Sequence, residues 1–339
     1  MVYTMKARAA VLYRINRPLE IIEIEIPKLK KGQVLVKILA SGICRRQLNE
    51  VKGYYGEDKY LPHLLGHEGE GEVVETGEKV TKVKKGDYAV LTWIKGKGQE
   101  ESFCQYRSKG TIINAGAITT FSDYAIISEN RLVKINKRIP ARVGAVLGCA
   151  IPTGIGMLRH NLKVKRGSSI AIFGVGGVGA SAIIGAKMLG CKNIIAIDID
   201  KGKLDFAKYL GATTTINYLK DNFDFRVDYA VEAAGKKEAM ETAFRVIKDK
   251  GTTVVAGNLK KGELICLDPF DLIRGKRIVG SWGGETKPYE DISYYGKQYL
   301  AGGLKIDKLI THKFKLKQIN QALKMLEGGQ VLGRMVIEF

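Results

Sequence analysis

The sequence predicts an α/β protein that combines a doubly wound parallel sheet with a second, mostly β domain. Two observations predict this architecture. From residue 169 onward, short apolar runs alternate with helix-forming segments, which is typical of parallel strands joined by crossover helices. Residues 1–150 instead contain short strand-like segments separated by frequent turns, which favours a barrel-like domain. The chain has 339 residues, 45% of them hydrophobic, and can therefore form two separate cores.

A glycine-rich turn at residues 174–179 organises the second half of the chain. The apolar run 169–173 predicts a buried strand before it, and the run 180–189 predicts a helix after it. A second strand follows at 193–197 and is closed by Asp198. The order of these elements predicts a Rossmann-type dinucleotide-binding unit, with a plain glycine-rich helix start as the alternative.

The glycines of the turn have physical roles in this prediction. Gly174 permits the sharp turn, Gly176 lets the backbone approach a pyrophosphate, and Gly179 lets the helix pack on the strand. Gly177 and Val178 complete the helix start, where unpaired N–H groups and the positive end of the helix dipole favour phosphates.

Asp198 favours NAD over NADP. A carboxylate at the end of the second strand can accept hydrogen bonds from both hydroxyls of an adenosine ribose. The same charge repels a 2′-phosphate, so the sequence predicts NAD as the cofactor.

The remaining elements follow from hydrophobic periodicity. Ile22, Ile24 and Ile26 alternate with Glu23 and Glu25, as in a strand with one face on a core. We expect further strands at 34–38, 71–74, 88–93, 228–231, 252–256, 277–281 and 331–339, and helices at 201–210, 236–248 and 319–326.

The composition predicts a cytoplasmic protein without a membrane segment. No apolar run reaches the roughly 18 residues of a membrane helix, and the first residues lack a signal-peptide pattern. Five scattered cysteines do not form a disulfide framework, so we expect free thiols or metal ligands.

The formal net charge of +20 has two interpretations. One is a surface for nucleic acid or acidic membranes, and the other is a general lysine-rich surface. The lysines are spread along the chain and do not alternate with aromatic residues, which favours the second interpretation. We therefore expect a small-molecule substrate, with neither nucleic acid nor a membrane as partner.

Cys44, His67 and Glu68 carry chemistry in the first part of the chain. Taken singly, Cys44 and His67 are explained by a buried thiol and a packed histidine. Their context resembles a known family, the zinc-dependent medium-chain alcohol dehydrogenases, nearly from end to end. The segments that carry the resemblance, besides the glycine turn, are 66–69, 86–87, 147–154, 203–204, 210–213, 231–235 and 310–312.

The resemblance implies a domain organisation and a reaction. Residues 1–150 and 287–339 would form a GroES-like catalytic domain, and residues 151–286 an NAD-binding domain. The family interconverts an alcohol and an aldehyde or ketone by hydride transfer to NAD, with zinc stabilising the alkoxide in a cleft between the domains. Its members self-associate, so the resemblance also implies a homo-oligomer, either a dimer or a tetramer.

By position, Cys44, His67 and Cys149 match the ligands of the family's catalytic zinc. Two thiolates and one imidazole leave a fourth coordination place open for water or substrate. Glu68 matches the family's carboxylate near the zinc, which binds the metal transiently or tunes the site electrostatically. Its alternative role is that of a salt-bridge partner.

Further roles are implied by position alone. The resemblance places Lys203 near the adenosine ribose, Thr153 at the nicotinamide, and Arg45 and Arg334 at the pyrophosphate. Trp93 matches an aromatic residue of the substrate-pocket wall. The alternatives are exposed charges for the two arginines and core packing for Trp93.

Three departures from the family pattern are visible. Only Cys104 remains of the four structural-zinc cysteines, so we expect no second zinc. Arg46 replaces a relay hydroxyl and Asn49 a relay histidine, so either the proton takes another route or Arg46 binds a negative substrate group. Gln47 replaces an aspartate that supports the zinc histidine, and its amide oxygen is a weaker acceptor than a carboxylate.

These departures keep several functional alternatives open. Within the family, the chain could be a dehydrogenase of a polyol, a sugar or an acidic substrate, or a zinc-poor reductase. From another class, it could be a binding protein that keeps the fold without turnover. The three zinc positions argue against this last alternative.

Overall fold

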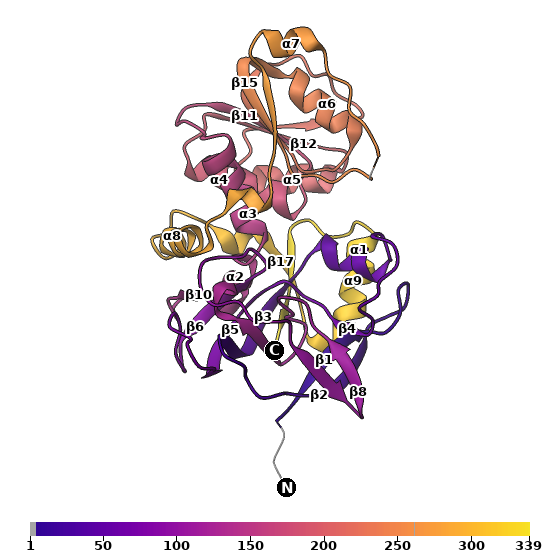
Figure 1. Ribbon diagram of the computed structural model, residues 1–339. Helices are drawn as coiled ribbons and strands as arrows, with labels where there is room; N and C mark the ends of the chain where they lie inside the picture. The colour runs from indigo at the N-terminus through magenta and orange to yellow at the C-terminus, as the bar shows by residue number, and fades with distance from the viewer. Residues whose placement is uncertain (1–4, 261) are drawn as a thin grey trace. The chain divides into compact units, whose positions relative to one another are not determined.

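The computed structural model describes residues 5–260 and 262–339 and divides into two compact units (Figure 1). Unit 1 comprises Met1–Cys149, Lys287–Leu300 and Ile310–Phe339. Unit 2 comprises Ala150–Thr286 and Ala301–Leu309. The resemblance implied that residues 287–339, including 301–309, belong to the catalytic domain, whereas the structure groups 301–309 with unit 2.

Unit 2 is built on a six-stranded parallel sheet flanked by helices. The strands lie in the order β13-β12-β11-β14-β15-β16, so the order reverses beside β11, where ligands bind in such sheets. The strands are β11 (Ser169–Phe173), β12 (Asn193–Asp198), β13 (Thr214–Asn217), β14 (Val227–Glu232), β15 (Ile247–Val255) and β16 (Arg277–Gly280); the helices are α3 (Ala150–Gly156), α4 (Gly177–Met188), α5 (Lys201–Leu210), α6 (Lys237–Arg245) and α7 (Pro269–Ile273).

The predicted strand, turn, helix and strand around residues 174–179 are confirmed. Every residue of β11 is buried, as expected of a central parallel strand covered on both faces. The predicted helix at 236–248 was too long, because α6 ends at Arg245. Ile247 already pairs with Val227 in the sheet, so strand pairing prevails there over the helical propensity of the following residues.

Unit 1 contains a closed barrel and a seven-stranded sheet, which confirms the predicted barrel-like β domain. The barrel order is β1-β2-β7-β8-β4, and the sheet order is β10-β6-β5-β3-β18-β17, with β9 paired to β3. The strands are β1 (Lys6–Leu12), β2 (Glu20–Glu25), β3 (Gln33–Ile43), β4 (His63–Leu64), β5 (Glu68–Thr76), β6 (Tyr88–Thr92), β7 (Gln105–Ser108), β8 (Thr111–Asn114), β9 (Tyr124–Ser128), β10 (Leu132–Ile135), β17 (Ile310–Phe314) and β18 (Arg334–Glu338).

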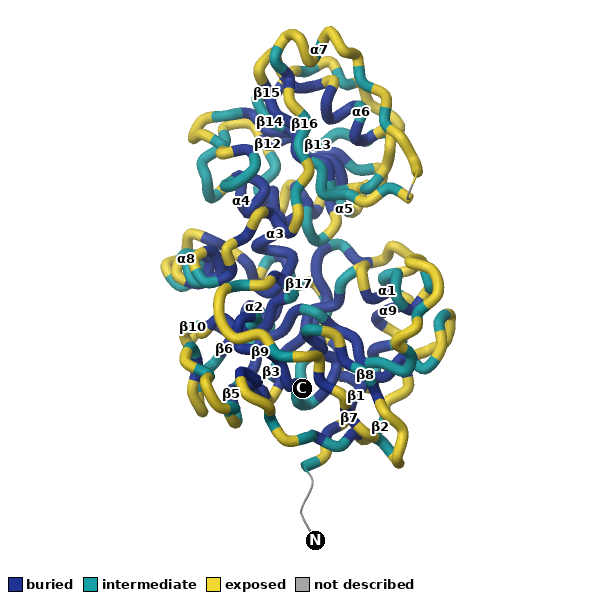
Figure 2. The backbone as a smooth tube through the Cα atoms, in the orientation of Figure 1, coloured by how far each residue is buried: buried dark blue, intermediate teal, exposed yellow. Residues whose placement is uncertain are grey.

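Four helices accompany these strands: α1 (Arg45–Val51), α2 (Ala141–Val146), α8 (Pro288–Leu300) and α9 (Ile319–Glu327). The sequence predicted α9 and missed α1, α2 and α8. Figure 2 shows the strands of both units as largely buried tubes and the connecting loops as exposed. Among the described residues, no helix combines the length and apolarity needed to cross a membrane.

Candidate active site

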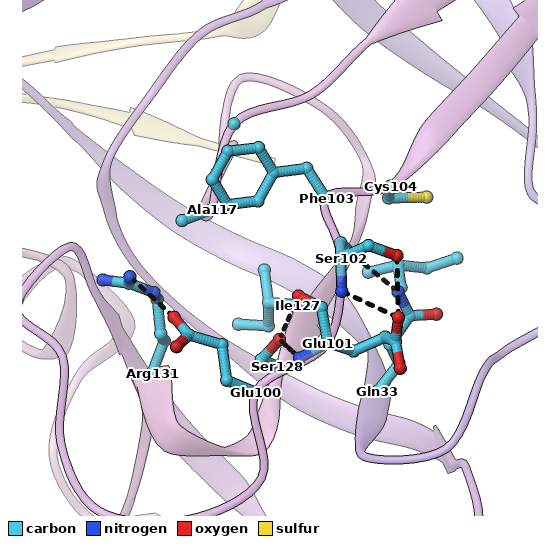
Figure 3. A pocket seen from close by; sticks show the side chains of 12 residues that line it. Gln33, Glu100, Glu101, Ser102, Phe103, Cys104, Ala117, Ile127, Ser128 and Arg131 are labelled. Carbon is cyan, nitrogen blue, oxygen red and sulfur yellow. Dashed lines mark hydrogen bonds and ion pairs between the residues drawn. The ribbon is translucent and has the colours of Figure 1, made fainter.

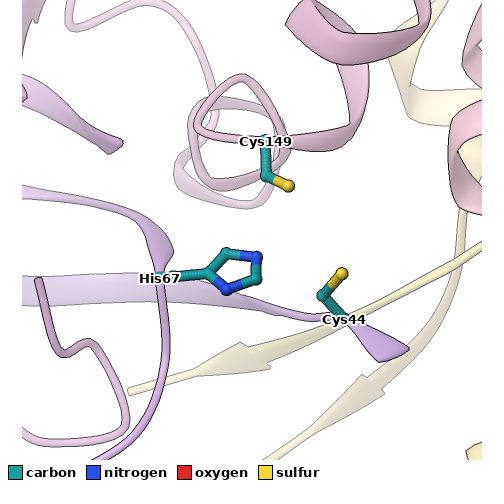
Figure 4. Close-up of side chains that lie close together, drawn as sticks. All are labelled: Cys44, His67 and Cys149. Atoms are coloured by element: carbon teal, nitrogen blue, oxygen red, sulfur yellow. The ribbon is translucent and has the colours of Figure 1, made fainter. Parts of the chain in front are cut away.

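Cys44, His67 and Cys149 converge in unit 1 from three distant parts of the chain (Figure 4). Cys44 follows β3 and is the N-cap residue of α1, His67 directly precedes β5, and Cys149 directly precedes α3. One potential ligand atom from each side chain lies within 4.8 Å of the others. Two sulfur atoms and one imidazole nitrogen at this separation match a Cys₂His metal site.

Two observations fit a bound metal ion at this cluster. His67 Nε2 is buried and has no hydrogen-bond partner among the described groups, so no protein contact competes with a metal for this atom. Hydrogen bonding to Cys149 lowers the pKa of the Cys44 thiol well below its usual value, and His67 and Arg334 lower it further although burial opposes them. The thiolate is the form that binds zinc.

Gln47 connects two of these three residues. Its Oε1 accepts a hydrogen bond from the backbone N–H of Cys44 at 2.8 Å, and its Nε2 lies 2.7 Å from Nδ1 of His67. The side chain is almost completely buried in α1. Gln47 therefore fixes the His67 ring relative to the backbone of Cys44.

Glu68 and Arg334 form a buried ion pair. Arg334 Nη2 contacts Glu68 Oε1, and the two side chains are 6% and 0% exposed. The space around Glu68 is tight: a Cβ added at Gly42 would lie 2.5 Å from its Cδ, and one at Gly148 would lie 2.9 Å from its Cβ. Glu68 therefore forms the salt bridge that was given above as its alternative role. Its partner, Arg334, is the arginine that the resemblance had placed at the pyrophosphate.

A cavity of about 660 Å³ lies within unit 1 and includes His67 in its wall. Two pairs of interacting polar or charged side chains lie in its wall, which also includes Glu57. Arg46 Nε donates to Glu50 at 2.8 Å, and the Arg46 guanidinium lies 3.9 Å from the centre of the Tyr55 ring. His63 Nε2 lies 2.8 Å from Asp58 Oδ2. The apolar part of the wall is formed by the side chains of Tyr55, Tyr60, Leu64, Leu65, Phe103 and Ile118.

The partners of Arg46 and His63 were not predicted from the sequence. The spacing of four residues between Arg46 and Glu50 on α1 was a signal that could have been used. Asp58 could not be assigned to His63 from the sequence, because the bend between them is formed by a loop without periodicity.

The structure gives Arg45 and Trp93 contacts within unit 1. Arg45 is exposed and donates to the backbone oxygen of Leu326 at 3.2 Å. The Trp93 ring lies 6.5 Å from the His67 ring and packs against a core cluster. Both the pocket-wall role and the core-packing role of Trp93 are compatible with this position.

The segment that holds a structural zinc in the resembled family is organised here by hydrogen bonds. Cys104 is buried, and burial raises its pKa to about 11. Figure 3 shows Arg131 donating to Glu100, and the backbone N–H of Glu101 donating to the Ser128 hydroxyl at 3.0 Å.

Glu129 ties the same segment to its surroundings. Its carboxylate accepts from the backbone N–H groups of Thr81 at 2.5 Å, Lys82 at 2.7 Å and Gln99 at 3.1 Å. Burial alone would raise the pKa of Glu129, but these hydrogen bonds outweigh it and lower the pKa. The carboxylate therefore stabilises the loop as an anion.

In unit 2, the glycine turn has the backbone expected for a phosphate-binding loop. Gly174 has a φ of +87°, and a Cβ at Gly179 would lie 1.8 Å from the oxygen of Gly174. Gly176 is the N-cap of α4, which begins at Gly177 and Val178. A side chain at Gly174 or Gly179 would disrupt this turn.

Asp198 holds the turn from the neighbouring strand. Its Oδ2 accepts from the N–H of Val175 at 2.8 Å, and its Oδ1 accepts from Ile199 and Asp200 at 2.9 and 3.1 Å. Lys203 is half-buried in the first turn of α5, and Thr153 is buried in α3.

Two family descriptions match this chain. Residues 30–137 match the alcohol dehydrogenase GroES-like domain, and residues 177–295 match the zinc-binding dehydrogenase domain. Together they cover parts of both units.

Curated relatives match over nearly the whole chain. An S-(hydroxymethyl)glutathione dehydrogenase of Synechocystis is 31% identical and one of Escherichia coli is 32% identical, each over 99% of this chain and 100% of the relative.

Solved structures agree with these matches. An alcohol dehydrogenase zinc-binding domain protein from Burkholderia ambifaria has a TM-score of 0.93 at 30% identity, covering 99% of this chain and 100% of that chain. A benzyl alcohol dehydrogenase from Acinetobacter calcoaceticus has a TM-score of 0.89 at 30% identity, covering 99% of both chains.

Proposed function

Since the chain belongs to the zinc-dependent medium-chain alcohol dehydrogenases and is an alcohol–carbonyl oxidoreductase, we propose that one zinc ion and NAD serve its reaction. Cys44, His67 and Cys149 would hold the zinc. The convergence of these three side chains within 4.8 Å is the observation that carries the proposal. A zinc ion supplies Lewis acidity, which makes an alcohol O–H easier to deprotonate near neutral pH.

The residues around the cluster have separate tasks. The two thiols bind as thiolates, and the low pKa of the Cys44 thiol favours that form. Gln47 orients the His67 ring. Glu68, next to His67 in sequence, is a further carboxylate of this site, and we propose that Arg334 neutralises and positions it. In this proposal, pairing with Glu68 is the main role of Arg334, and contact with a pyrophosphate is secondary.

NAD binding is supported by the turn at 174–179 and by Asp198. The carboxylate of Asp198 accepts three backbone hydrogen bonds, and its four lone-pair directions leave room for a ribose hydroxyl. Its negative charge disfavours a 2′-phosphate. The proposed contacts of Lys203, Thr153 and Arg45 with the cofactor follow from family position.

The cavity favours a neutral alcohol with an apolar or aromatic body. Arg46 and His63 each already face a carboxylate, so neither offers an uncompensated positive charge to an acidic substrate. Tyr55, Tyr60 and Phe103 supply aromatic surface. This argues against the expectation that Arg46 binds a negative substrate group. The benzyl alcohol dehydrogenase relative is compatible with this substrate class.

We also propose a homo-oligomer, a dimer or a tetramer. Strand β16 lies at the edge of the unit 2 sheet, and an edge strand can pair with a second chain. Nearby in sequence, Leu272, Ile273 and Trp282 are 46%, 77% and 77% exposed. Exposed apolar side chains of this size mark interaction surfaces when they gather.

One experiment tests the metal, the cofactor and the substrate class together. Zinc content is measured per chain, and reduced-nicotinamide absorbance is followed with NAD or NADP and four substrates: benzyl alcohol, a short aliphatic alcohol, a hydroxy acid and S-(hydroxymethyl)glutathione. We expect one zinc, turnover with NAD and a preference for benzyl alcohol. A Cys149→Ser variant is expected to lose both zinc and turnover. Full turnover in a zinc-free Cys149→Ser variant would overturn the proposed site.

A further inference from the structure

Gln47 faces two groups that compete for its single acceptor atom. In the structure the amide oxygen accepts from the Cys44 N–H, and the amide nitrogen faces His67 Nδ1. An amide nitrogen can only donate, so Nδ1 must offer its lone pair in this arrangement. A neutral imidazole then carries its proton on Nε2.

Metal binding requires the opposite proton position. Nε2 is the buried nitrogen without a hydrogen-bond partner among the described groups, and therefore the atom that would bind a metal. A bound metal uses the Nε2 lone pair, so the proton must lie on Nδ1, which then needs an acceptor. Gln47 is the side chain within hydrogen-bond reach of Nδ1, so its oxygen would have to turn toward the ring. Turning the amide places its NH₂ group against the Cys44 N–H.

A carboxylate does not have this conflict. Both of its oxygens accept, so one could receive the Cys44 N–H and the other the His67 Nδ1–H. Gln47 is 1% exposed, so water is a poor substitute for the lost partner. The amide therefore satisfies both of its neighbours in the metal-free form and leaves one N–H without an acceptor in the metal-bound form.

We propose that Gln47 is a positioning residue that keeps the metal of the Cys44–His67–Cys149 cluster weakly held and exchangeable. This inference rests on the proposed zinc site. It concerns how tightly the metal is held, whereas the proposed function concerns only whether it is held.

The affinity test compares two variants of the full-length protein that add the same charge to α1. Gln47→Glu supplies a second acceptor at the same reach. Asn49→Asp is the control, because Asn49 is half-buried on the same helix and contacts Tyr55 rather than His67. Zinc dissociation constants are measured by competition with a chromophoric chelator, and folding is checked by circular dichroism.

We expect Gln47→Glu to bind zinc about tenfold or more tightly than the native protein, and Asn49→Asp to change affinity less than about threefold. Equal affinities of Gln47→Glu and Asn49→Asp would overturn the inference while leaving the zinc site intact. Absence of zinc binding in every protein would overturn the proposed function and this inference together.

A second measurement needs no substitution. The chain has four histidines, so ¹⁵N-labelled imidazole signals can be resolved, and the ring that shifts on zinc addition is assigned to His67. We expect the proton on Nε2 before zinc is added and on Nδ1 afterwards. A proton on Nδ1 in both states would show that Gln47 already acts as an acceptor and would overturn the inference.

Discussion

The guanidinium of Arg334, in the last strand of the chain, pairs with the carboxylate of Glu68, and both side chains are almost completely buried. Removing one member leaves the other charge buried and uncompensated, which costs about 3–5 kcal/mol in comparable pairs. We expect Arg334→Met and Glu68→Gln each to lower the free energy of unfolding by that order, measured by urea denaturation.

The double variant separates the ion pair from other contacts. If the penalty comes from an unpaired buried charge, the double variant Glu68→Gln/Arg334→Met will lose less unfolding free energy than the sum of the losses in the two single variants. Strictly additive losses would contradict this account.

Glu50→Gln should change substrate preference. The substitution removes the carboxylate that pairs with Arg46, so the guanidinium becomes available to an anionic substrate. We expect the kcat/KM ratio of a hydroxy acid to benzyl alcohol to rise up to about fivefold, the scale of a partly exposed ion pair. Glu57→Gln is the control, because Glu57 lines the same cavity. An equal rise in that variant would indicate a general charge effect.

Asp198→Ala should weaken the preference for NAD over NADP. The variant removes the charge that repels a 2′-phosphate, and we expect the ratio of kcat/KM values for NAD and NADP to fall by about tenfold or more. The control is Asp200→Asn, which removes a charge two residues away and retains a side chain able to cap α5. An unchanged cofactor ratio in Asp198→Ala would exclude Asp198 as the discriminating residue.

Glu129→Gln should loosen the segment 95–104. The variant weakens three backbone hydrogen bonds to a charged acceptor, and we expect a loss of about 2 kcal/mol in unfolding free energy. Limited proteolysis should cleave this segment faster. Glu101→Gln, in the same loop, serves as the matched control.

The native segment should resist proteolysis equally with and without a chelator, and chelator-dependent cleavage would point to a metal there.

Glu70 gives the protein a pH-dependent stability. It lies in β5, 1% exposed, and burial raises its pKa to about 7, above the ordinary value of 4.5. The unfolded chain therefore loses this proton at lower pH than the folded chain, so Glu70 reduces stability progressively from about pH 4.5 to 7. Glu70→Gln should raise the melting temperature at pH 8 and leave it nearly unchanged at pH 4.

The neighbouring carboxylate provides the comparison for this prediction. Glu72 is half-buried on the same strand, and Glu72→Gln should change the melting temperature little at either pH. A stabilisation of Glu70→Gln that is the same at pH 4 and pH 8 would contradict the role of ionisation.

The sequence predicted the elements whose signal is local. The helix at 201–210 and the strand at 169–173 have the observed bounds, because a single periodicity and a flanking glycine define them. The helix α8 was missed, because most of its large apolar residues are tyrosines mixed with charged residues, and it packs against β10. Ile292 and Tyr295 are buried three positions apart, but tyrosines are equally common on exposed faces, so this spacing was a weak signal.

The metal ligands of the candidate site could be predicted from the sequence, but the side chains that pair with the surrounding residues could not. Cys44, His67 and Cys149 were identified through family motifs, and the structure brings their ligand atoms together. The pairing of Glu68 with Arg334 joins residues that are far apart in the chain, so no spacing rule could have indicated it.

The place of β18 in unit 1 has a consequence for biosynthesis. This strand, Arg334–Glu338, is hydrogen-bonded to β3 on one side and to β17 on the other, so it lies inside the sheet. During translation the sheet formed by the first 149 residues therefore cannot be completed until the codons for β18 have been read. Until then β3 exposes an open strand edge, and nascent or prematurely terminated chains carry a surface to which chaperones or other unfinished chains can bind.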